Sequence, residues 1–152
     1  MELKQLKSEL IEACYQQIKK KLDLIDEELD SVQQSASEDT KSSAGDKYET
    51  GREMMMLEKT KLLNQKEQVA KQLKPLQKID VNKDFMQIET GALIKASNAL
   101  YFIASSIGQV KLAEQSVFVI SPLAPIAQAM LGKKKGDAFE INGNKQVILS
   151  VD

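Results

Sequence analysis

The chain has 152 residues, of which 42% are apolar and 28% charged, which is typical of a soluble folded chain with one domain or two small ones. It contains no His, no Trp and only 5% aromatic residues, which excludes an easy general base near pH 7, the commonest zinc ligand and a large stacking pocket. Its net charge of −1 excludes a uniform electrostatic attraction to nucleic acid, although local patches can still attract it.

The first predicted element is a long helix that begins within the first few residues. Seven apolar residues follow one another at spacings of four and three, which is a coiled-coil seam three heptads long. They are Ile11, Tyr15, Ile18, Leu22, Ile25, Leu29 and Val32, and they are preceded by Leu3, Leu6, Leu10 and Cys14 at a looser spacing. The helix should fade in the stretch "QQSASEDTKSSAG", residues 33–45, because its Ser, Asp, Thr and Gly residues favour turns and caps.

Three observations favour a cytoplasmic location. The single cysteine, Cys14, excludes an internal disulfide and a Cys-rich zinc site, and it fits the apolar period as a small core residue. The N-terminus "MELKQLKSEL" is charged throughout, so no signal peptide is expected. No apolar run approaches the ~20 residues of a spanning helix.

A second long helix is predicted after Asp46. Met55, Leu62, Val69 and Leu76 lie seven residues apart, and Pro75 disfavours helical geometry at Lys74, so we place the end of this helix there. Two such helices most simply fold back on each other as an antiparallel hairpin, with arms on the order of 45 Å long. Acidic residues of the first helix would then face basic residues of the second. They are Asp23, Asp26, Glu27, Glu28 and Asp30 on one side, and Arg52, Lys59 and Lys61 on the other.

The second half of the sequence predicts a small sheet. Its short apolar runs are separated by Gly, Asn, Ser and Pro, and they are "QIETGALIKA", "NALYFIAS", "SVFVISP", "DAFEI" and "KQVILSV". The "GNK" after Asn142 is typical of a hairpin turn, and "PIAQAMLG" predicts a short helix between Pro125 and Gly132. We therefore expect an α+β chain: a coiled-coil hairpin at residues 1–76 and a compact α+β domain at residues 80–152.

Two separated segments match motifs that occur together in one known family. "PIAQAMLGKKKGD", residues 125–137, matches the signature Pro-Ile-Ala-x-Ala-Leu-Leu-Gly-Lys-x-x-Gly-Asp, with Met130 in place of the first Leu and Ala124 where that family usually has Ser. Gly45, Asp46 and Glu49 match the pattern Gly-Asp-x-x-Glu-Asn of a hairpin tip, whereas Thr50 replaces the Asn and the following Ala-Glu-Tyr is missing. With these two motifs the chain resembles the Gre-type transcript cleavage factors (the GreA/GreB family).

The resemblance implies a transcription elongation factor that binds RNA polymerase. It implies an FKBP-like second domain that docks at the rim of the polymerase secondary channel, and a hairpin that enters the channel and meets RNA and DNA only indirectly. The tip acids Asp46 and Glu49 would help to hold a catalytic Mg²⁺ and its attacking water in the polymerase active site, which fits the preference of Mg²⁺ for one or two carboxylates. The free protein would bind no cofactor and would be no enzyme itself. We expect a monomer with no membrane contact.

Candidate polymerase contacts come from both halves of the chain. They are Met54 near the tip, and Pro125, Gln128, Lys133, Lys134 and Lys135 in the docking domain. Plainer interpretations exist for each: Asp46 as a helix cap, the methionines at 54–56 as seam filling with at least one left exposed, and the three lysines as a solvated turn.

Other functions stay open on the sequence alone. A tip that has lost part of the family pattern could bind the channel without stimulating cleavage, as a competitor or modulator. An FKBP-like prolyl isomerase or chaperone is disfavoured by the scarcity of aromatic residues. A third possibility is a structural coiled coil that dimerises through residues 3–32.

Overall fold

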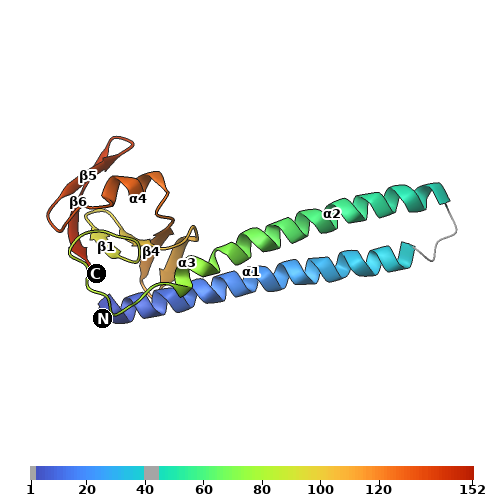
Figure 1. The fold of residues 1–152 in the computed structure, drawn as a ribbon, viewed down its shortest axis with the longest axis horizontal. Helices are drawn as coiled ribbons and strands as arrows, with labels where there is room; N and C mark the ends of the chain where they lie inside the picture. The colour runs from blue at the N-terminus through green and yellow to red at the C-terminus, as the bar shows by residue number, and fades with distance from the viewer. Residues whose placement is uncertain (1–2, 40–44) are drawn as a thin grey trace. The chain divides into compact units, whose positions relative to one another are not determined.

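The computed structural model describes the backbone of residues 3–39 and 45–152 and the side chains of residues 3–35 and 50–152 (Figure 1). The chain divides into two compact units: Gln17–Lys71, and Met1–Gln16 together with Gln72–Asp152. The predicted domain boundaries, 1–76 and 80–152, stay a prediction, because a compact unit need not be a domain that folds alone. We call the two units the helical unit and the sheet unit.

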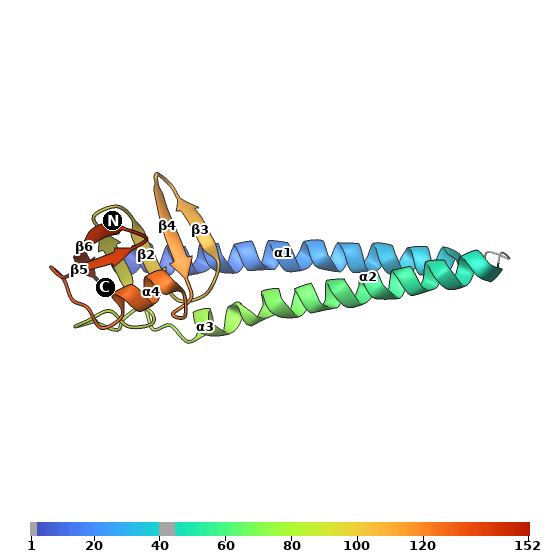
Figure 2. The same cartoon turned by 90° about the horizontal axis from the view of Figure 1, so that it is seen from above.

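The helical unit is made by two long helices. Helix α1 (Leu3–Asp39) enters it at Gln17, and helix α2 (Gly45–Lys71) lies beside α1 in both views (Figures 1 and 2). Among the side chains of this unit that the structure describes, three apolar ones are buried: Ile18, Ile25 and Leu62. All three belong to the predicted heptad positions, whereas the other seam positions of the unit are only half-buried. A pair of helices therefore forms, but its seam is thin.

Among the described residues, an ion pair joins Asp26 of α1, one of the predicted acids, to Lys66 of α2, which is outside the predicted set of basic partners. Lys66 Nζ lies 2.7 Å from Asp26 Oδ1, with both side chains almost half exposed. Pairs of this exposure contribute about 0–1 kcal/mol, so this pair sets the register of the helices more than their stability. Lys61, one of the predicted partners, makes no ion pair with any residue that the structure describes.

The end of the second helix was predicted wrongly. Helix α2 ends at Lys71, and a separate short helix α3 (Leu73–Gln77) follows it and contains Pro75. Proline is tolerated there because it lies in the first turn of α3, where a backbone N–H would have no partner within the helix. Pro75 therefore helps to start a helix here and does not mark the end of one.

The sheet unit contains a mixed six-stranded sheet in the order β3-β4-β2-β1-β6-β5. Strands β2 and β4 pair in parallel, and the other neighbouring strands are antiparallel. The strands are β1 (Leu93–Ala96), β2 (Leu100–Ile103), β3 (Gly108–Leu112), β4 (Gln115–Ile120), β5 (Ala138–Ile141) and β6 (Asn144–Val151). Together with the long helices, this sheet confirms the α+β class.

Two details of the predicted sheet need correction. The first predicted strand is shorter than its apolar run, because Gly91 takes a φ of +97°, which interrupts an extended chain before β1. Strand β3 was not predicted, because only Val110 of its five residues is buried and its polar neighbours give a weak alternating pattern. The hairpin turn at Asn142 and Gly143 is confirmed, with φ values of +52° and +80°.

Both faces of the sheet are covered. On one face Tyr101 and Ile103 belong to a buried cluster with Ala127 and Met130 of helix α4 (Pro125–Met130). The adjacent residue Phe102 points to the opposite face and is also fully buried. The apolar residues of the first four turns of α1, Leu6, Leu10 and Cys14, are buried within the same unit.

Lys7 is the one charged side chain among the largest fully buried side chains of the described residues, at 1% exposure. Its Nζ lies 4.9 Å from the centroid of the Phe85 ring, and it lines a cavity of about 90 Å³ together with Asp152. Burial lowers the pKa of Lys7, because desolvation disfavours the ammonium form and the attraction of nearby carboxylates only partly opposes this. The neighbouring lysines, Lys4 and Lys83, each have an acidic partner within 4 Å, and Lys7 has none.

We predict that Lys7→Met raises the free energy of unfolding of the sheet unit by about 1 kcal/mol at pH 7, since a desolvated charge is replaced by an apolar chain of similar length. A lowered folded-state pKa means that the unfolded chain binds more protons, so the wild type gains stability as pH rises towards the ordinary value of 10.5. In urea unfolding, the difference in the free energy of unfolding between the Lys7→Met variant and the wild type should therefore narrow as pH rises towards 10.5.

Lys4→Met is the matched control, because the Lys4 side chain is 55% exposed and lies one turn away. This variant should show no comparable gain. A Lys7→Met protein that is less stable than wild type at every pH would contradict our interpretation of Lys7 as a costly buried charge.

Candidate functional site

The predicted tip acids lie at the start of helix α2. Asp46 and Glu49 fall in its first two turns, but their side chains are outside the described residues, so their role as Mg²⁺ ligands stays a prediction. The backbone condition for that role is met, because Asp46 and Glu49 both lie within the helical range Gly45–Lys71. Since Gly45 is already helical, Asp46 is inside the helix and not at its cap position.

A strip of exposed apolar residues follows the tip on α2. Met54 is 66% exposed, Met56 62% and Leu57 71%, whereas Met55 is half-buried. Met55 is the one methionine of the three in the predicted heptad, so the expectation that at least one neighbour stays exposed is confirmed. Met54 is therefore accessible, as a contact with a partner requires.

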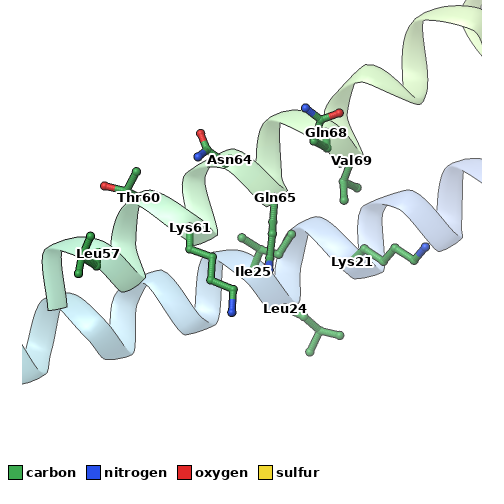
Figure 3. Close-up of a pocket in the computed structure, with 10 residues that line it drawn as sticks. All are labelled: Lys21, Leu24, Ile25, Leu57, Thr60, Lys61, Asn64, Gln65, Gln68 and Val69. Carbon is green, nitrogen blue, oxygen red and sulfur yellow. The ribbon is translucent and has the colours of Figure 1, made fainter. Parts of the chain in front are cut away.

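An apolar groove runs between α1 and α2 further along the helical unit (Figure 3). It has a volume of about 790 Å³ and is lined by ten residues, none of them acidic. Ile25 forms its buried floor, and Gln65 and Lys61 extend from α2 towards α1. Leu24 and Leu57 line the groove with 51% and 71% of their surface exposed.

This groove was not predicted from the sequence. The signal was present, because Leu24 and Leu57 are large apolar residues that do not fit the heptad spacing of their own helices. An apolar residue beside a seam is either covered by another element or left exposed, and periodicity alone does not decide between the two.

The "PIAQAMLGKKKGD" segment combines a short helix with a tightly bonded turn. Pro125 lies in the first turn of α4, and Gly132 follows the helix with a φ of +83°. The Lys134 N–H donates to Asp137 Oδ2 at 2.9 Å, and the Gly136 N–H donates to the Ile148 carbonyl at 2.8 Å. Much of this motif is therefore explained by backbone geometry, since the glycines and Asp137 form the turn itself.

Only some side chains of this segment are exposed to solvent. Lys134 and Lys135 are exposed and Lys133 is half-buried. Pro125 and Gln128 are also exposed, although Gln128 Nε2 donates to the Pro122 carbonyl at 2.6 Å. The predicted partner-binding residues of this segment thus lie on one short stretch of surface chain.

Leu123 is an addition that sequence reasoning did not find. It precedes α4 and is 83% exposed, in a turn held by its own N–H, which donates to Ser121 Oγ at 3.1 Å.

The described residues contain neither a candidate metal-binding cluster nor a helix that could span a membrane. Among the residues that the structure describes, no group of three or more Cys, Asp or Glu side chains could hold a metal ion. In the same part of the chain, no helix is long and apolar enough to cross a membrane.

No family model matches the sequence, and no curated protein matches it. Among solved structures, one described as "Structure of the transcription factor Gfh1" is 18% identical to this chain, with 91% of this chain and 93% of that chain covered and a TM-score of 0.35. A TM-score of this size does not establish a shared fold, and a shared fold would not by itself establish a function.

Proposed function

We propose that this chain is a transcription factor that binds RNA polymerase, inserts its helical unit into the secondary channel and docks its sheet unit at the channel rim. The observation that carries the proposal is the hairpin of α1 and α2, in which the start of α2 bears Asp46, Glu49 and the exposed Met54. Helix α2 alone has 27 residues, which corresponds to about 40 Å. A slender element of this length suits a narrow channel.

The tip acids would act in trans on the chemistry of the polymerase. Two carboxylates one helical turn apart would complete the coordination of a Mg²⁺ whose remaining ligands belong to the polymerase and the RNA. The metal would polarise the scissile phosphate and lower the pKa of an attacking water. The chain would therefore have no active site of its own and would stimulate hydrolysis of backtracked RNA by its partner.

The docking surface of the sheet unit would be the exposed side chains around α4. Leu123 and Pro125 supply apolar contact, and Lys134 and Lys135 supply positive charge for an acidic polymerase surface. The fold of this unit would be FKBP-like. A prolyl isomerase role is disfavoured, because Tyr101, Phe102 and Phe139 are buried and Phe118 is the one exposed aromatic residue of the described strands.

The docking proposal predicts that Lys134→Glu/Lys135→Glu lowers the affinity for core RNA polymerase at least about tenfold, because two attractive charges become repulsive. A matched control is Lys78→Glu/Lys111→Glu, which makes the same change in net charge at two other exposed lysines. Affinities would be measured by surface plasmon resonance at constant salt.

The docking surface is elsewhere if both double variants bind alike. No complex with core polymerase at micromolar concentration of the wild type would end the proposal as a whole.

The tip proposal predicts that Asp46→Asn/Glu49→Gln reduces stimulated RNA cleavage in a backtracked elongation complex at least about tenfold, with polymerase affinity retained. The amides keep the shape of the side chains but are poor Mg²⁺ ligands. Glu53→Gln/Glu58→Gln is the matched control on exposed positions of the same helix, and it should cleave like wild type.

Unchanged cleavage in the tip variant would remove Asp46 and Glu49 from the mechanism. A wild type that binds the polymerase but stimulates no cleavage would identify the chain as a competitor or modulator of the channel, which is the alternative that Thr50 raises.

A further inference from the structure

The exposed surface of α1 around Leu24 is complementary to itself. Leu24 is 51% exposed, and its neighbours on the same helical face, three and four residues away, are Lys20 and Lys21 on one side and Glu27 and Glu28 on the other. All four charged residues are exposed. Positive charge therefore precedes the leucine along the helix, and negative charge follows it.

An antiparallel pairing of two copies brings these charges together. With Leu24 of each copy on a two-fold axis, Lys21 faces Glu27 of the other copy and Lys20 faces Glu28, because the residue numbers of opposed positions then sum to 48. Each pair occurs twice, as an isologous interface requires. A parallel pairing would place lysines against lysines and glutamates against glutamates.

The groove between α1 and α2 supplies the apolar part of the same surface. Leu24 lies at its edge and Leu57 stands on the opposite wall (Figure 3).

We propose that this face of α1 binds a second copy of the chain, in a two-fold symmetric dimer centred on Leu24. The dimer is separate from the proposed polymerase binding and uses none of the predicted tip or docking residues. Because each copy contributes few large apolar side chains, the dissociation constant is on the order of 100 µM, and the chain is a monomer at low micromolar concentration.

Sedimentation velocity of the purified full-length chain between about 5 and 500 µM tests the proposal. The weight-average mass should rise towards twice the monomer mass, and Leu24→Glu should abolish the rise. Leu63→Glu is the matched control, since Leu63 is 47% exposed on α2 and does not line the groove. Helix content by circular dichroism confirms that both variants are folded.

A charge-swap series tests the two-fold register. Lys21→Glu and Glu27→Lys should each weaken the dimer about tenfold, because each places like charges opposite one another twice. The double variant Lys21→Glu/Glu27→Lys should recover most of the loss, since both pairs are restored with reversed polarity. Increasing salt should weaken the wild-type dimer, because these pairs are exposed.

Oxidative cross-linking gives an independent geometric readout. With diamide as the oxidant, Leu24→Cys should form a disulfide dimer at 100 µM, a concentration of about the expected dissociation constant, and Leu63→Cys should not. Cys14 does not interfere, because it is buried and its pKa is raised to about 11 by desolvation. The sedimentation range runs from about twentyfold below to about fivefold above the expected constant. A wild type that stays monomeric to about 500 µM, a dimer that survives Leu24→Glu, or no recovery in the double variant would each overturn the proposal.

Discussion

The structure of the helical unit depends on the small apolar surface that two helices can bury against each other. A pair of helices shares one seam, and here that seam fully covers Ile18, Ile25 and Leu62 and only part of the remaining heptad positions. Apolar residues beside the seam have no third element of the unit to cover them. This is why three large apolar side chains are exposed: Leu24, Met54 and Leu57. Exposed apolar side chains on a helix are candidates for contact with another protein.

The sequence predicted the helices well and the sheet less completely, for physical reasons. An apolar repeat that continues over three heptads is a strong signal for a helix, because chance spacing seldom reproduces it. The spacing therefore predicted α1 and most of α2. Pro75 misled because its effect depends on position: it blocks the interior of a helix but is tolerated in a first turn. Strand β3 offered one buried residue, Val110, which is too little to produce a visible alternation.

Part of the candidate site was also predictable from the sequence, and part of it was not. The acids at positions 46 and 49 and the Pro125–Asp137 motif were found by resemblance, and the structure explains much of the second as turn geometry, with Asp137 accepting from the Lys134 N–H. The turn geometry does not require lysines at positions 134 and 135. A contact with a partner would explain these residues and their exposed neighbours better. Leu123 and the groove were missed because exposure depends on three-dimensional neighbours.

The two proposed uses of the helical unit are compatible by mass action. Self-association depends on the square of the free monomer concentration, whereas binding to a polymerase depends on its first power. A weak dimer therefore withdraws little monomer when the chain is dilute, and any tighter partner competes with it successfully. When the chain is concentrated, the dimer covers Leu24 and so removes exposed apolar surface from water. The narrow seam leaves Leu24 exposed, and a second copy can cover it.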